Sequence, residues 1–143
     1  MNPRVHLITL GVSDLERSRA FYQDGLGFPA SRSATDGIIF FQTGGVSLAL
    51  YPVDKLAEDI SPDLPAKRIG FPGLTLAHVA KTKKEVDDVL ASAEKSGGKI
   101  EKPAQDTFWG GYSGYFSDPD GHYWEVAFAE SWEFNEDGSL LID

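Results

Sequence analysis

The sequence predicts an α+β protein made of two tandem βαβββ modules, whose curved mixed sheets surround a cleft and carry one helix each on the outside. Two kinds of observation predict this fold. The same type of helix start occurs twice, 69 residues apart, with Thr82 and Glu85 repeating Ser13 and Glu16. Glycines follow each helix, and short strand-like segments follow the glycines. Similarity at a fixed interval is typical of a repeated structural unit.

The first module is expected over residues 1–52. Residues 5–12 alternate apolar and other side chains, as a strand does. Ser13 and Glu16 then form a capping-box pattern, in which a hydroxyl and a carboxylate satisfy free amides at a helix start. Three strands are expected after that helix, at residues 28–33, 37–43 and 46–51.

Residues 53–72 form the expected connector, because prolines and charges occur there without a sustained period, apart from one helical turn at 55–59. The second module, over residues 73–129, repeats the order of the first. Its helix begins at a second capping box, formed by Thr82 and Glu85, and carries an apolar stripe. Its strands are expected at residues 74–80, 99–102, 112–117 and 123–129.

A tail over residues 130–143 lies beyond the repeat. Trp132 and Phe134 occur there among acidic residues, and an exposed tail would not need these apolar groups. We therefore expect the tail to pack on the domain or on a partner subunit. The modules, connector and tail are expected to form a single structural domain.

Composition narrows the classes of function. The 143 residues carry a formal charge of -9, which argues against nucleic acid and membrane as partners because both select basic surfaces. The absence of cysteine excludes disulfides, thiolate metal sites and thiol chemistry. Because neither a signal peptide nor an apolar run of membrane-spanning length is visible, the expected location is the cytoplasm.

The last strand of the second module carries a carboxylate in an unusual place. Pro119 and Gly121 suit a tight turn, and a strand follows it. Side chains alternate along a strand, so Glu125 is expected on the face opposite Trp124 and Val126, which belong to the core. A carboxylate in that position either lines a cavity or faces water.

These motifs resemble those of the glyoxalase / bleomycin-resistance / extradiol-dioxygenase superfamily, also called the vicinal oxygen chelate superfamily. The segments that carry the resemblance are residues 10–22, 25–28, 97–100 and 118–126. The resemblance implies the fold predicted above and a homodimer. It does not fix a reaction, because the superfamily includes lyases, isomerases, ring-cleaving dioxygenases and proteins that sequester drugs.

The resemblance also implies a divalent metal, held by His, Glu or Gln from the first and last strands of each module. Glu125 matches the last-strand position of the second module. The other three positions fall on apolar residues or weak donors, namely Leu7, Ala49 and a residue near Thr75. We therefore expect no metal and no other cofactor, with Glu125 serving as a polar anchor, hydrogen-bond acceptor or general base.

Two histidines leave the metal question open. His6 is one residue away from the ligand position, which places it on the opposite face of its strand. His78 shares the helix-facing side of its strand with Leu74 and Leu76, although a bulge before Thr82 could turn it toward the cleft. Either change would revive a divalent metal site.

Aromatic residues around a glycine pair suggest the wall of a small-molecule pocket. Trp109 and Tyr115 lie in this stretch, although Trp109 fits a core or dimer contact equally well. The predicted ligand-binding residues are Thr9, Tyr51, Thr75, Trp109 and Tyr115, and the predicted catalytic residue is Glu125.

Three functions fit these observations. The first is binding of a small organic molecule in a cleft between the modules, without the full metal site of the superfamily. The alternative is a metal-dependent lyase, isomerase or dioxygenase with Glu125 as a ligand. The third is a structural dimer module without a ligand.

Overall fold

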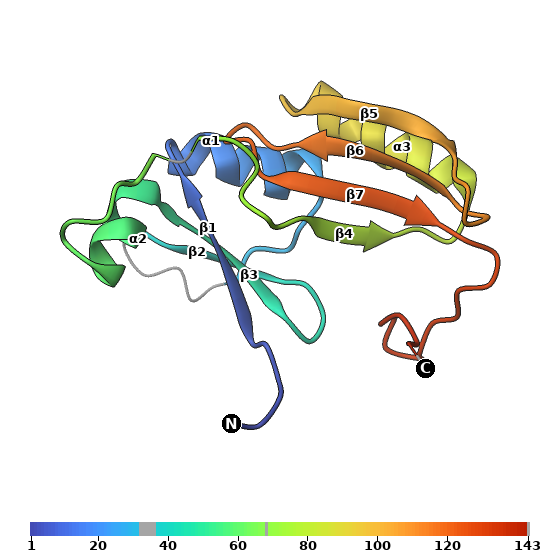
Figure 1. The fold of residues 1–143 in the computed structure, drawn as a ribbon, viewed down its shortest axis with the longest axis horizontal. Helices are drawn as coiled ribbons and strands as arrows, with labels where there is room; N and C mark the ends of the chain where they lie inside the picture. The colour runs from blue at the N-terminus through green and yellow to red at the C-terminus, as the bar shows by residue number, and fades with distance from the viewer. Residues whose placement is uncertain (32–36, 68, 143) are drawn as a thin grey trace. The chain divides into compact units, whose positions relative to one another are not determined.

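The computed structural model describes residues 1–31, 37–67 and 69–142. The chain divides into two compact units, Met1–Gly73 and Leu74–Asp143, and each contains a sheet with its own helices (Figure 1). The first unit contains β1 (Leu7–Val12), α1 (Leu15–Arg19), the π-helix η1 (Ala20–Gly25), β2 (Ile39–Gln42), β3 (Ser47–Pro52) and α2 (Val53–Ile60). The second contains β4 (Leu76–Val79), α3 (Lys83–Lys95), β5 (Lys99–Asp106), β6 (Tyr112–Ser117) and β7 (Tyr123–Phe128).

The two sheets share one topology. The strand order is β1-β3-β2 in the first sheet and β4-β7-β6-β5 in the second. β1 runs parallel to β3 and β4 runs parallel to β7, whereas β2 and β6 are antiparallel to the strands that follow them. The predicted α+β class, with a repeated unit and mixed sheets, is therefore confirmed.

The strand predicted at residues 28–33 is reduced to a single bridge in the described part of the chain. Ala30 forms an isolated antiparallel bridge with Phe41, whereas residues 32 and 33 lie outside the described residues. The bridge is formed at the outer edge of β2, just as β5 pairs along the outer edge of β6. The first unit therefore contains a short equivalent of β5. Pro29 lacks an amide proton, which limits pairing at this edge.

The first helix begins one residue later than predicted. Asp14 is its N-cap, and the Asp14 carboxylate accepts a hydrogen bond of 2.9 Å from the Arg17 amide. Ser13 instead accepts from the Arg17 guanidinium, and Glu16 pairs with Arg19. The capping box predicted for Ser13 and Glu16 is therefore wrong, because the neighbouring aspartate caps a helix at least as well as serine.

The second predicted capping box is present in slightly shifted form. The Thr82 hydroxyl accepts from the Glu85 amide at 3.0 Å. The Glu85 carboxylate accepts from the amide of Lys81, one residue before the cap, at 2.8 Å. Both bonds satisfy amides that the helix itself leaves free at the start of α3.

Elsewhere the element boundaries differ modestly from prediction. The helical turn expected at 55–59 is part of α2, which contacts β1 and β3. β5 extends to Asp106 rather than ending at residue 102. Its pairing with β6 is interrupted by register shifts on both sides of Lys102, and Pro103 lies within it. An edge strand tolerates such a proline, because its amide need not enter a ladder.

Helix α3 covers one face of the second sheet, where it contacts β5, β6 and β7 (Figure 1). Val86 and Leu90 of the predicted apolar stripe are buried, as are Phe116 and Val126 of the sheet. A Cβ at Gly114 would lie 2.7 Å from Leu90 Cδ1 and 2.8 Å from the Lys102 carbonyl oxygen. Glycine at this position therefore allows the helix and β5 to approach β6 closely.

The tail folds back on the second unit. Trp132 stacks on Trp109 with 5.4 Å between ring centroids, and Lys81 Nζ lies 5.5 Å from the centre of the Phe134 ring. Phe134 also forms a bridge with Leu140. In the described part of the chain, none of the helices combines the length and apolar character that crossing a bilayer requires.

Candidate functional site

The hairpin of β6 and β7 brings Tyr115 and Glu125 together. The two residues are direct partners in the antiparallel ladder between the strands. Cross-strand partners point to the same face of a sheet, and that face alternates along each strand. Phe116 and Trp124 are the next pair, and they are buried on the side of α3. Tyr115 and Glu125 therefore lie on the face opposite α3, where both are half-buried.

The turn before β7 fixes this register. The Asp118 carboxylate accepts hydrogen bonds of 2.9 Å from the amides of Asp120 and His122. The Gly121 amide donates to the Asp118 carbonyl. A turn held by its own first residue leaves little freedom for the strands to slip, so the pairing of Tyr115 with Glu125 follows from the turn.

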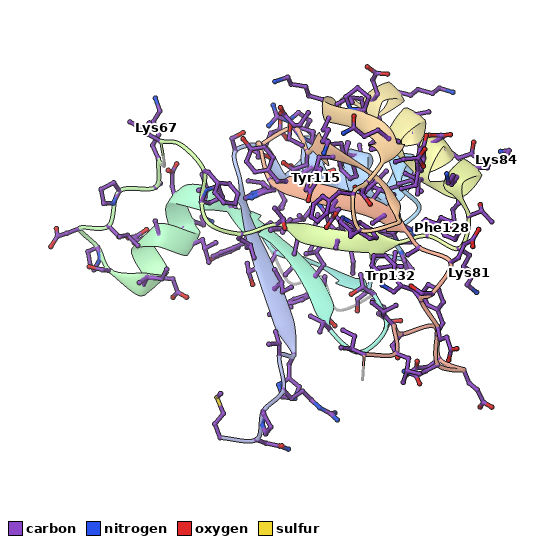
Figure 2. The ribbon with its side chains drawn as sticks, turned by 45° about the vertical axis from the view of Figure 1, so that its right-hand side comes forward. Lys67, Lys81, Lys84, Tyr115, Phe128 and Trp132 are labelled. Carbon is purple, nitrogen blue, oxygen red and sulfur yellow. The ribbon has the colours of Figure 1, made fainter. Side chains whose placement is uncertain are left out.

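The two side chains face each other across the β6–β7 ladder. Burial raises the pKa of Tyr115 above its ordinary value, and the negative charge of Glu125 raises it further. The phenol is therefore protonated at neutral pH. Tyr115 is labelled on the second sheet in Figure 2.

Short side chains flank the pair toward one end of the hairpin, whereas Ser117 and Tyr123 form the next pair on this face toward the turn. Ala77 is the partner of Glu125 on the parallel strand β4. Ser113 and Ala127 are partners of each other two residues away along the hairpin. Ala77 is exposed, whereas Ser113 and Ala127 are buried.

A second carboxylate on the same face, that of Glu101 on the edge strand β5, has two polar partners. The Ser117 hydroxyl donates to Glu101 at 2.8 Å, and Lys99 Nζ lies 3.2 Å from the other Glu101 oxygen. These two contacts, first the serine and then the lysine, lower the pKa of Glu101. Lys102 is the β5 partner of Tyr115, on the side away from Glu125.

The structure divides the predicted site residues between the units. Thr9 and Tyr51 belong to the first unit, where Thr9 is the partner of Ala49 and Tyr51 the partner of Gly11. Thr75 belongs to the second unit, precedes β4 and is exposed. Ala77, rather than Thr75, lies beside Glu125 on the neighbouring strand.

Trp109 has packing partners of its own. It lies in the turn between β5 and β6, which is closed by hydrogen bonds of 2.9 Å between Thr107 and Gly111. A Cβ at Gly111 would lie 1.9 Å from the Trp109 ring, so the indole covers this glycine. Trp132, labelled in Figure 2, covers the indole in turn. Trp109 thus anchors the tail, and 43% of its surface remains exposed.

His78 lies on the face of the second sheet opposite Glu125. His78 is the β4 partner of Val126, on the side of α3, and its Nε2 lies 3.8 Å from Glu85 Oε1 on that helix. The helix-facing position predicted for His78 is therefore observed, although the side chain is partly exposed rather than packed. His6 precedes β1 and is exposed.

Residues 4–126 match the model of the Glyoxalase/Bleomycin resistance protein/Dioxygenase superfamily. The chain belongs to this superfamily. A glyoxalase-related enzyme from Fulvimarina pelagi is 36% identical, with 98% of each chain covered and a TM-score of 0.87. The structure of a superfamily protein from Nocardioides shares 28% identity over 92% of this chain and 87% of its own, with a TM-score of 0.70.

A lactoylglutathione lyase from Agrobacterium tumefaciens also has a similar structure. The identity is 26%, with 94% of this chain and 100% of the other covered and a TM-score of 0.67. A comparison with curated proteins gives no match. These similarities confirm the predicted superfamily and fold.

The donor set of this superfamily member does not fit the metal that the resemblance implies. The positions at which ligands were expected carry Leu7, Ala49, Thr75 and Glu125, and the observed neighbour of Glu125 is Ala77. Only Glu125 among them is a strong ligand for a divalent cation. Within residues 1–31, 37–67 and 69–142, no group of three or more His, Cys, Asp or Glu is arranged to hold a metal ion.

Proposed function

We propose that this superfamily member binds a small organic molecule at the Tyr115–Glu125 face of its second sheet, without the divalent metal of the superfamily. The observation that carries the proposal is the Tyr115–Glu125 pair, whose members are direct partners on one face of the hairpin and are both half-buried. A few polar groups on a partly buried surface are typical of a site that orients a small ligand.

The fold itself gives no reason for this pair. The core of the second unit lies on the opposite face, between α3 and residues such as Phe116 and Val126. Removing an ionised carboxylate from water is unfavourable unless partners replace the water. The single phenol that faces Glu125 cannot satisfy all the acceptor sites of its carboxylate, which favours a role in binding over a role in stability.

The metal-free part of the proposal rests on the four strand positions described above. A catalytic metal site ordinarily has about three protein ligands and one open position. Leu7, Ala49 and Thr75 offer no strong ligand at the expected positions, and neither does Ala77 beside Glu125. In this proposal the carboxylate acts directly, as a hydrogen-bond acceptor or a general base, and no cofactor takes part.

The second candidate is a metal-dependent lyase, isomerase or dioxygenase in which Glu125 is a ligand. The observation in its favour is the similarity to the glyoxalase-related enzyme and the lactoylglutathione lyase. A purified protein that holds a stoichiometric divalent ion would favour this candidate. A metal-free protein that binds its ligand would favour the first.

The proposal also includes a homodimer in the cytoplasm. The dimer is implied by the resemblance to the superfamily. Light scattering of the purified protein tests the assembly, and a fluorescent fusion in the source cell tests the location. Neither outcome changes the assignment of the Tyr115–Glu125 face.

A thermal-shift screen of small metabolites, run with a chelator present, tests the proposed site. A bound ligand raises the melting temperature, because it stabilises only the folded protein. The same hits are then compared in Glu125→Gln and in Glu94→Gln, which changes an exposed carboxylate on α3. We expect the shift to persist in Glu94→Gln and to disappear in Glu125→Gln. Equal shifts in both variants would remove Glu125 from the site.

A further inference from the structure

We infer that the stacked rings of Trp109 and Trp132 border the ligand on the Tyr115–Glu125 face, and that the ligand carries an apolar group which contacts them. This inference rests on the function proposed above. It adds the tail residue Trp132 to the site and specifies a ligand with one polar and one apolar end.

The indole of Trp109 lies on the same face of the second sheet as Glu125. The Tyr112 hydroxyl donates to the Asp87 carboxylate of α3 at 2.8 Å, so Tyr112 points toward the helix. Because side chains alternate along an extended segment, a Cβ at Gly111 points away from the helix. That Cβ would lie 1.9 Å from the Trp109 ring. The ring is therefore on the face opposite α3.

The tail holds this indole in position. The Trp132 amide donates to the Ala129 carbonyl, so the chain turns back directly after β7. The Trp132 ring then stacks on the Trp109 ring, with 5.4 Å between centroids and 24° between planes. Trp109 still has 43% of its surface exposed. An aromatic surface that is both held and exposed can contact an apolar group with little loss of conformational freedom.

The covered part of this face ends next to Glu125. Ser113 and Ala127, the ladder pair on the side of the stack, are 3% and 2% exposed. Tyr115 and Glu125 are half-buried. Gly111 lies four residues from Tyr115, about 13 Å along an extended strand. An indole on Gly111 and a ligand with one ring together span that distance.

The two ends of the face differ in polarity. Toward the turn between β6 and β7, the pair next to Tyr115 and Glu125 is Ser117 and Tyr123, and both carry hydroxyl groups. Toward the other end, the exposed surface is that of an indole. A ligand with a polar and an apolar end therefore meets matching surfaces in one orientation, with its apolar end toward Trp109.

Titration with 2-phenylethanol, followed by NMR of protein labelled at tryptophan and glutamate, tests the inference. We expect the indole N–H groups of Trp109 and Trp132 and the carboxyl of Glu125 to shift with one Kd. Trp124 is the internal control and should not shift, because it is buried against Phe116 on the side of α3. Ethanol, which lacks the ring, should leave all the indole groups unshifted.

Two tail variants separate binding from folding. Trp132→Ala should weaken 2-phenylethanol binding at least about fivefold, because burial of its ring against the stack is lost. Phe134→Ala removes the ring beside Lys81 and leaves the stack in place. Both variants should lower the melting temperature, but Phe134→Ala should keep the affinity within about twofold. Equal affinities in the two variants would overturn the inference.

The outcomes also separate this inference from the proposed function. The hits of the thermal-shift screen are titrated in the same way as 2-phenylethanol. Compounds that bind in a Glu125-dependent way without shifting Trp109 or Trp132 would overturn the inference and leave the proposed function intact. Absence of any Glu125-dependent compound would overturn both.

Discussion

Ala77 lies directly beside Glu125 on the neighbouring parallel strand. Its methyl group offers no donor to a cation beside that carboxylate. On the other side of Glu125, the ladder places Tyr115 as its partner on β6.

Ala77→His should create affinity for zinc where the natural chain has little. The new imidazole would stand next to Glu125 and supply a second donor of the type zinc prefers. Calorimetric titration with zinc measures the gain. The double variant Ala77→His with Glu125→Gln is the matched control and should lose it. Stoichiometric zinc in the unmodified protein would contradict the donor argument.

Glu125→Gln should lower the pKa of Tyr115 without restoring its ordinary value. The substitution removes the negative charge and the charged acceptor, but burial, the largest cause of the raised pKa, remains. Ultraviolet titration of the tyrosines measures the change, and Tyr115→Phe identifies the phenol concerned. Tyr112, whose pKa is raised mainly by its hydrogen bond to Asp87, is the internal control and should titrate unchanged.

The same raised pKa makes stability depend on alkaline pH. The folded protein holds the Tyr115 proton more tightly than the unfolded chain does. This stabilisation is fully present below the ordinary tyrosine pKa and is lost as pH rises through the folded value. Urea unfolding across that alkaline range should show a loss of stability that is smaller in Tyr115→Phe. An identical pH dependence in both proteins would contradict the assignment.

Asp14→Ala should destabilise the protein by about 1 kcal/mol, whereas Ser13→Ala should cost less. Asp14 accepts a hydrogen bond from a free amide of the first helical turn, whereas Ser13 accepts one from the Arg17 guanidinium. Urea denaturation of the two variants measures the difference. A larger loss of stability in Ser13→Ala than in Asp14→Ala would instead support the capping box predicted from Ser13 and Glu16.

Gly114→Ala should destabilise the second unit by about 1–3 kcal/mol. The added methyl would collide with Leu90 Cδ1, 2.7 Å away, and with the backbone of β5. Ser92→Ala, on the exposed side of α3, is the control and should change the free energy of unfolding by less than about 0.5 kcal/mol. Equal free energies of unfolding for the two variants would mean that Leu90 and β5 leave room for a methyl group at residue 114.

The position of Glu125 could be predicted from sequence because strand alternation is a local rule. Trp124 and Val126 mark the core face, and Glu125 between them must take the other. The partnership with Tyr115 was also within reach, since the short turn after Ser117 sets the register of the hairpin. Counting outward from that turn pairs Tyr115 with Glu125.

Other features depended on contacts between distant segments. Nothing in the sequence indicates that the Trp132 ring would stack on the Trp109 ring and so hold the tail against the second unit. The register of β4 against β7 places Ala77 rather than Thr75 beside Glu125, and parallel strands have no turn that fixes such a register. The early end predicted for β5 reflects Pro103, which an edge strand accommodates.

Calorimetric titration of chelator-treated protein with a ligand from the thermal-shift screen tests the central claim most directly. The account predicts that the natural chain binds without metal and that Glu125→Gln binds at least about tenfold more weakly, a difference of about 1.4 kcal/mol. Binding that disappears on chelation and returns with a divalent ion would contradict it, as would equal affinity in the two proteins.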